Sequence, residues 1–150
     1  MRAVCYPMRM GQLSMNQAER EAFLADLHVG VLSVERPDGP PLATPIWYRY
    51  TPGGAVEFTI EAGGQKGRLL QAVGRATLCV QREQVPYAYV TVDGPVAIRP
   101  PSEAVTADIA ERYLGEQGAA EYLASSQLDD EVLVQLTPAH WYTIDFAKLG

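Results

Sequence analysis

The chain has 150 residues, of which 47% are hydrophobic and 20% are charged, and its formal net charge is −6. This length and composition indicate one globular domain with a hydrophobic core of its own. The acidic balance argues against nucleic acid and anionic membranes as partners, because both require a basic protein surface. No apolar run reaches membrane-spanning length and the N-terminal residues lack a signal-peptide pattern, so we expect a cytoplasmic protein.

The N-terminal part predicts an arm followed by a helix. Residues 1–13 are expected to form a flexible arm, and residues 14–150 a single domain. Ser14 and Gln17 have the spacing of a capping box, and apolar residues then recur at helical intervals up to about His28. We expect His28 to cap the C-terminal carbonyl groups of this helix.

From residue 30 the hydrophobic period changes to two, which is typical of strands. Strands are predicted over residues 30–36, 42–50 and 55–61, joined by tight turns rich in proline and glycine. Pro45 lies inside the second run and has no N–H for a ladder. It therefore marks an edge strand or a bulge.

Residues 55–73 carry the most informative pattern in the chain. A strand is followed by a glycine pair and then by Lys66 and Arg68 at the start of a short helix that ends before Gly74. A helix N-terminus presents unpaired N–H groups, and two flanking cations complete a site for an anion. Cations at this end of a helix are otherwise unfavourable, which argues against a merely solvated first turn. The pattern therefore predicts binding of a phosphorylated small molecule.

The remaining elements are mostly strands. We expect a strand over residues 76–82, a long strand over 87–98 with a bulge at Asp93–Gly94, and strands over 131–136 and 141–146. Ser102 can cap a helix that ends at Gly115, and a looser helical piece follows. Short strands joined by tight turns, with helices that interrupt them, indicate a small antiparallel barrel with helical covers.

Four segments together, residues 29–50, 55–73, 74–80 and 87–98, resemble the pyridoxamine-phosphate-oxidase-like split-barrel flavoproteins, especially the branch that uses the deazaflavin coenzyme F420. The order and spacing of the segments carry this resemblance. It implies a mainly β fold, namely a six-stranded antiparallel split β-barrel of the FMN-binding type. It also implies a homodimer with two cofactor sites in the subunit interface.

The resemblance further implies a set of cofactor contacts. The matching positions are Thr44, Pro45, Ile46 and Trp47 beside the ring, Thr59, Ile60 and Glu61 at the ring and ribityl chain, Lys66 and Arg68 at the phosphate, and Tyr87 and Tyr89 from the second subunit. From the residues alone, Trp47 fits a core or interface position equally well, and Thr59 and Glu61 fit a solvated strand end. The chain also lacks the arginine-rich C-terminal segment with which the vitamin-forming oxidases bind pyridoxal phosphate.

The sequence contains no Ser-His-Asp signature, no carboxylate pair suited to acid–base catalysis and no zinc-ligand spacing. We therefore name no catalytic side chain and no metal ligand, and assign the chemistry to a bound cofactor. The first hypothesis is an oxidoreductase that uses coenzyme F420, or alternatively FMN, to transfer hydride to a small unsaturated or conjugated substrate. The second is a non-catalytic protein that binds a flavin, a deazaflavin or a tetrapyrrole. A structural subunit without a ligand is the third.

Overall fold

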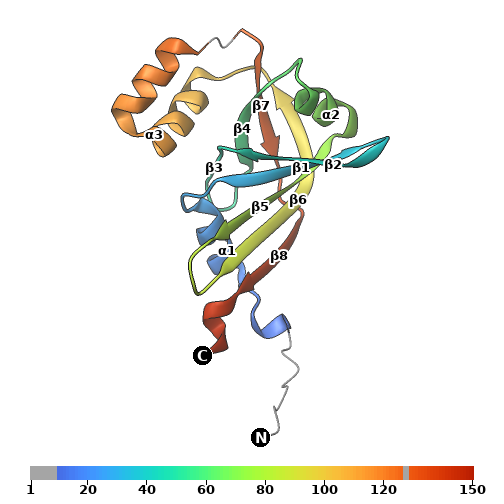
Figure 1. The fold of residues 1–150 in the computed structure, drawn as a ribbon, viewed down its shortest axis with the longest axis vertical. Coiled ribbons are helices and arrows are strands. Elements are labelled where there is room, and N and C mark those ends of the chain that lie inside the picture. Colours follow the sequence, from blue (N-terminus) through green and yellow to red (C-terminus); the bar gives the residue numbers. More distant parts are fainter. Residues whose placement is uncertain (1–9, 127–128) are drawn as a thin grey trace, which may run out of the picture.

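The computed structural model describes residues 10–126 and 129–150, in which eight antiparallel strands and three α-helices form a split barrel (Figure 1). The strands are β1 (Gly30–Arg36), β2 (Gly39–Ile46), β3 (Arg49–Tyr50), β4 (Val56–Glu61), β5 (Arg75–Arg82), β6 (Ala88–Arg99), β7 (Glu131–Leu136) and β8 (His140–Asp145). The helices are α1 (Gln17–Ala25), α2 (Gln65–Val73) and α3 (Glu103–Ser125), and 3-10 turns occur at Met10–Gln12 and Phe146–Leu149.

The sheet has the strand order β2-β1-β5-β6-β7-β4-β3, and β8 pairs with β6 beside this path. The predicted fold class is therefore confirmed, with eight strands in place of six. The strand expected over residues 42–50 is interrupted at Trp47 and Tyr48, which separates β2 from β3. The edge position of β2 agrees with the interpretation of Pro45, whose missing N–H costs no ladder bond at an edge.

Strand β6 joins the two halves of the barrel because it changes its partner midway. Its residues 88–93 pair with β8, and its residues 96–99 pair with β7. The bulge predicted at Asp93–Gly94 is wrong, since the β5–β6 register runs without a shift from Arg82 to Arg75. Gly94 serves instead as the crossing point, because a Cβ there would overlap the Thr137 carbonyl oxygen of the β7–β8 connection.

The core fills the barrel with one face of each long strand. Alternate residues of β1, β5 and β6 point inward, as in the buried, partly buried alternation of β5. Tyr48 and Phe58 are the largest side chains that are completely buried, and Leu70 of α2 closes one end. The opposite face of these strands is mostly half-buried, with a few exposed side chains such as Val31, so it can still make contacts outside the chain.

Helix α1 begins two residues later than predicted. Its N-cap is Asn16, whose side chain accepts a hydrogen bond from the Glu19 N–H at 2.9 Å, whereas the Ser14 hydroxyl donates to the Gly11 carbonyl. The predicted role of His28 is confirmed, since its Nε2 lies 2.9 Å from the Phe23 carbonyl oxygen. Of the predicted arm, residues 1–9 lie outside the described residues, and Leu13 is buried with its carbonyl bound to the Asp145 N–H.

Helix α3 is capped by Ser102, as predicted, and bends sharply at Gly115, where φ is 74° and ψ is 173°. Glycine adopts this positive φ without a Cβ clash, so the chain reverses direction inside what would otherwise be one long helix. The half before the bend packs Val105, Ile109 and Tyr113 toward the sheet. Across the described residues, no helix combines the length and apolar character needed to cross a bilayer.

Candidate functional site

A pocket of about 410 Å³ lies where the edge strand β2, strand β4, helix α2 and helix α3 meet. These four elements come from distant parts of the sequence and converge at one end of the barrel (Figure 1). The residues that line the pocket are Val29, Pro45, Ile46, Trp47, Thr59, Lys66, Thr106, Ile109, Ala110 and Tyr122. The lining is therefore mainly apolar and aromatic and includes one cation, which is typical of sites for small organic ligands.

Helix α2 enters the pocket through a tightly packed turn. A Cβ on Gly67 would overlap the Glu61 carbonyl oxygen and lie 2.6 Å from that of Ala62, so only glycine lets the first turn of α2 approach β4 this closely. Asp130 holds the turn by accepting a hydrogen bond from the Gly63 N–H at 3.2 Å. At the start of α2, the Arg68 N–H donates to the Gly64 carbonyl. The N–H groups of the helical residues that precede Arg68 therefore point outward from the N-terminus of the helix.

Lys66 projects from this first turn into the pocket. Partial burial lowers the pKa of its ammonium group, because removing a charge from water disfavours the charged form. Among the residues that the structure describes, no carboxylate forms an ion pair with Lys66. A partly desolvated cation beside a helix N-terminus attracts an anion more strongly than an exposed lysine does.

The opposite wall is aromatic. The Trp47 ring stacks on the Tyr113 ring with a centroid distance of 5.1 Å and an interplanar angle of 5°. Tyr122, from the half of α3 beyond the bend, lies 6.0 Å from Trp47 at an angle of 53°. Planar aromatic faces such as these favour a flat, conjugated ligand. The pocket therefore combines a place for a negative group with a place for a ring.

Five of the predicted site residues lie together in this pocket: Pro45, Ile46, Trp47, Thr59 and Lys66. They come from three separate segments, which the resemblance alone had placed near one ligand. The side chain of Trp47 therefore belongs to the pocket wall, in addition to packing against α3.

The other predicted residues nearby do not line the pocket. Arg68 and Glu61 are exposed, and Ile60 packs in the core. Thr44 lies one residue before Pro45, and its Oγ1 is buried with no hydrogen-bond partner among the described residues. The predicted phosphate role of Arg68 stays a prediction, since its side chain lies outside the pocket of its own chain.

Tyr87 and Tyr89 lie on the outer face of the sheet. Tyr87 is 53% exposed, and the Tyr89 ring packs 6.0 Å from the Tyr142 ring. Burial and the neighbouring Tyr142 raise the pKa of Tyr89. Their predicted role as contacts from a second subunit stays a prediction, because only one chain is described.

The sequence reasoning missed half of the pocket lining. None of the five residues Val29, Thr106, Ile109, Ala110 and Tyr122 was predicted as a site residue. Tyr122 reaches the pocket only because α3 turns back at Gly115, so periodicity in the sequence gives no signal for it. The glycine itself was the available clue, since it was expected to end the helix.

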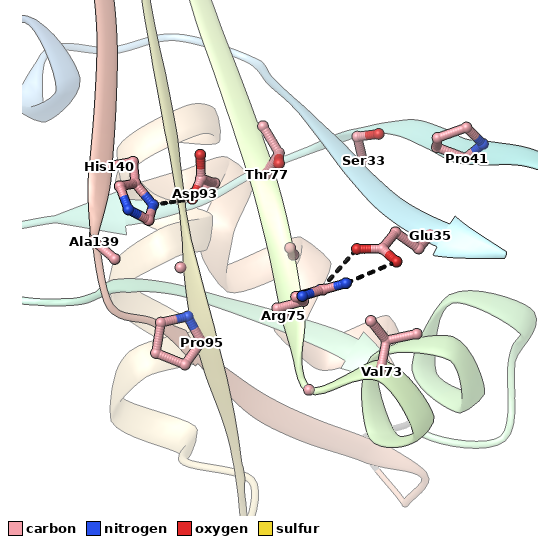
Figure 2. Close-up of a pocket in the computed structure, with 13 residues that line it drawn as sticks. Ser33, Glu35, Pro41, Val73, Arg75, Thr77, Asp93, Pro95, Ala139 and His140 are labelled. Carbon is pink, nitrogen blue, oxygen red and sulfur yellow. Dashed lines mark hydrogen bonds and ion pairs between the residues drawn. The ribbon is translucent and has the colours of Figure 1, made fainter.

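A larger hollow of about 600 Å³ lies on the outer face of β1, β5, β6 and β8 (Figure 2). Its charged side chains already have partners. Arg75 donates to both oxygens of Glu35 at 2.7 and 3.1 Å, and His140 Nδ1 lies 2.8 Å from an oxygen of Asp93. We call this hollow the outer groove. Because these groups are already paired, the smaller pocket, whose Lys66 has no ion-pair partner among the described residues, is the better candidate for an anionic ligand.

Within residues 10–126 and 129–150, no group of three histidine, cysteine or acidic residues is arranged to hold a metal ion. The pocket itself offers one ammonium group, hydroxyl groups and an indole, none of which is a usual metal ligand.

The model of the family described as pyridoxamine 5'-phosphate oxidase matches residues 17–145, which is most of the chain. The chain belongs to this family. The family includes flavin-dependent oxidoreductases, and its split-barrel fold binds flavins. No curated protein matches the chain significantly in sequence.

Solved structures share the split-barrel fold of the family. A conserved hypothetical protein from Mycobacterium tuberculosis matches with a TM-score of 0.78 and 24% identity, covering 93% of this chain and 90% of that protein. A protein described as an F420 reductase matches with a TM-score of 0.66 and 27% identity, covering 81% and 94%. A protein from Mesorhizobium loti described as FAD-binding matches with a TM-score of 0.65 and 19% identity, covering 87% and 94%.

Proposed function

We propose that the chain is an oxidoreductase that uses the deazaflavin coenzyme F420, with FMN as the alternative cofactor. The observation that carries this proposal is the partly buried Lys66, which faces an aromatic-walled pocket without an ion-pair partner among the described residues. A cation in this position is costly for the protein alone. A phosphate group bound beside Lys66 would remove that cost and would also complement the N-terminus of α2.

The residues present fit both ends of such a cofactor. Lys66 and the outward N–H groups at the start of α2 would hold a phosphate, while Trp47 and Ile46 would contact the ring. Thr59 and Thr106 add hydroxyl groups to the same lining, and a polar ribityl chain would need such hydrogen-bond partners. Thr44 precedes Ile46 and Trp47 near the end of β2, and its buried Oγ1 has no hydrogen-bond partner among the described residues.

When bound, the cofactor would supply hydride transfer, which explains why the pocket needs no nucleophile of its own. The side chains of this chain would bind and orient the ring, and the apolar lining of α3 would exclude water from one side of it. We propose a small unsaturated or conjugated molecule as the substrate, because such a molecule can accept hydride and lie flat against the ring.

The preference for F420 over FMN is supported by the F420 reductase, which shares 27% identity with this chain over most of both lengths. The structure described as FAD-binding, at 19% identity, bears on the fold alone.

We also propose that the protein acts as a homodimer. The outer face of the sheet carries a row of directly paired residues that runs from the pocket edge across four further strands: Pro45, Val31, Cys79, Thr91 and Tyr142. Val31 and Tyr142 of this row are 43% and 55% exposed, so a second copy on this face would remove apolar surface from water. Since Pro45 also lines the pocket, a second copy on this face would cover the pocket edge. Analytical ultracentrifugation of the wild type and of Val31→Glu tests this, and a monomeric wild type would contradict it.

Titration with each cofactor, followed by a reductase assay, tests the proposed function. We expect the purified protein to bind F420 more tightly than FMN, and a panel of conjugated acceptors to oxidise the reduced cofactor in its presence. Tight binding without turnover of any acceptor would favour the second hypothesis, a protein that only binds the cofactor. Absence of binding to both cofactors would overturn the proposal.

A further inference from the structure

The hydroxyl group of Tyr113 lies where the two backbone segments that flank the pocket come together. It donates a hydrogen bond to the His28 carbonyl at 2.6 Å and accepts one from the Tyr48 N–H at 3.2 Å. The residues next to these two contacts are Val29 and Trp47, and both line the pocket. One side chain that lies outside the pocket thus connects two of its walls.

Trp47 needs such support because the sheet does not provide it. Strand β2 ends at Ile46 and β3 begins at Arg49, so Trp47 and Tyr48 have no ladder partners. The Tyr113 ring also lies nearly parallel to the Trp47 indole, at 5.1 Å and 5°. Backbone position and ring plane of this segment are therefore both determined by contacts with Tyr113.

Tyr113 is itself held rigidly on α3. The preceding residue, Arg112, donates hydrogen bonds to the Ala25 and Asp26 carbonyls at the end of α1. Asp108, one turn before Arg112, forms an ion pair with Arg49 at 2.8 Å. The half of α3 before the Gly115 bend is thus joined to the end of α1 and to β3.

We infer that Tyr113 is a positioning residue that sets the orientation of Trp47, and through it the ring-binding wall of the pocket. This inference rests on the proposed function, because the ring that Trp47 would contact is that of the proposed cofactor. Tyr113 acts through the indole and touches no ligand, since it is absent from the pocket lining. The bond to His28 places Val29 in the same way.

A double-mutant cycle tests the inference, with Tyr113→Phe, Trp47→Phe and the double variant titrated with F420 and with FMN. Tyr113→Phe keeps the ring stack and the helix and removes only the hydroxyl bonds, so the variant is expected to fold. We expect it to weaken cofactor binding roughly tenfold, within the range for residues in contact. In the Trp47→Phe background the same change should have a clearly smaller effect, because the indole that Tyr113 positions is gone and only the contact toward Val29 remains.

Tyr50→Phe is the matched control. The Tyr50 hydroxyl accepts a hydrogen bond from the Gly53 N–H, which lies in a turn away from the pocket lining. Its loss should leave cofactor affinity unchanged and should add independently to Trp47→Phe. Full additivity of Tyr113→Phe with Trp47→Phe, or an unchanged affinity in Tyr113→Phe, would overturn the inference.

A second readout needs no cofactor. Acrylamide quenching of tryptophan fluorescence, with Trp47→Phe as the reference for the remaining Trp141, reports how firmly the indole is held. We expect Tyr113→Phe to increase quenching of the Trp47 component and Tyr50→Phe to leave it unchanged. If neither cofactor binds, the proposed function fails, and the quenching result alone decides whether Tyr113 positions Trp47. Unchanged quenching would then refute the positioning role.

Discussion

The pocket at α2 and the outer groove differ in what their charged groups already bind. The outer groove is larger, about 600 Å³ against 410 Å³, and it contains the Arg75–Glu35 ion pair and a hydrogen bond between His140 and Asp93. The pocket contains Lys66 without a carboxylate partner among the described residues, next to a helix N-terminus. By volume alone, the outer groove would be the better candidate for the ligand site. The charged groups favour the pocket, because its cation is available to an anionic ligand.

This difference shows how a protein keeps a site ready for an anion. A paired cation offers little to a ligand, because the ligand must first compete with the carboxylate. A partly desolvated cation without a partner destabilises the free protein and binds an anion strongly. We therefore expect substitution of Lys66 to change both stability and cofactor binding, and substitution of Arg75 in the outer groove to change neither.

The largest effect is expected from Gly67→Ala, at the turn that carries Lys66. The added Cβ would meet two backbone carbonyl oxygens, so α2 must shift as a unit. We expect the free energy of unfolding to fall by about 3 kcal/mol, at the upper end of overpacking costs. Urea denaturation followed by circular dichroism measures this.

Gly64→Ala is the matched control for Gly67→Ala. The nearest atom to its added Cβ, the Glu61 carbonyl oxygen, lies at 3.5 Å, an ordinary contact, and its φ of −72° suits any residue. We expect a change within about 1 kcal/mol, because glycine is only moderately better than alanine at an N-cap. Equal losses in the two variants would show that the close packing of α2 on β4 does not determine the turn.

The next largest effect is expected from Lys66→Met. Loss of a charge-assisted contact should weaken cofactor binding by about 2 kcal/mol, roughly 30-fold. The melting temperature of the free protein should rise, because the substitution removes a partly desolvated charge and keeps most of the aliphatic stem. Isothermal titration and thermal melting measure these opposite changes.

Arg68→Met provides the matched control on the same helix. Arg68 is exposed and lies outside the pocket, so its replacement should affect cofactor binding less than Lys66→Met does. An equal or larger loss of affinity would assign Arg68 the phosphate contact that the sequence predicted. A lower melting temperature in Lys66→Met would contradict the interpretation that Lys66 is a partly desolvated cation without an ion-pair partner among the described residues.

The pH dependence of stability and of cofactor binding tests the role of Lys66. The folded protein has a Lys66 pKa below the value of the unfolded chain, so in the alkaline window between the two values the unfolded state binds more protons. The stability contributed by this group is therefore lowest below the folded pKa and rises as pH passes through the window. Cofactor affinity should fall over the same window, because the ammonium group loses its charge. Lys66→Arg should abolish the fall, since a guanidinium stays charged.

Most strands of this chain were predictable from the sequence, because the alternation of residue types along a strand reflects which of its faces is buried. Alternation in residues 30–36 and 76–82 predicts which side chains face the core, and the structure agrees. The break after Ile46 was not predictable, because Trp47 and Tyr48 are good strand residues. Their departure from the ladder depends on α3, which lies more than 50 residues later.

The candidate site was predictable only where local chemistry carried the signal. Lys66 follows a glycine pair and begins a helix, so the sequence itself pointed to an anion. Pro45, Ile46, Trp47 and Thr59 were placed by resemblance, and the structure brings them to the same pocket. Contributions from α3 were missed because they depend on the bend at Gly115, whose angle no local pattern encodes.

The smallest effect is expected from Arg75→Leu in the outer groove. Arg75 and Glu35 form an exposed pair, in which the guanidinium holds the pKa of the Glu35 carboxyl below its usual value. Water and salt screen such a pair, so we expect no measurable change in melting temperature or in cofactor affinity. A loss of affinity comparable to that of Lys66→Met would show that the outer groove takes part in binding the cofactor. The contrast between a paired and an unpaired cation would then no longer explain where the ligand binds.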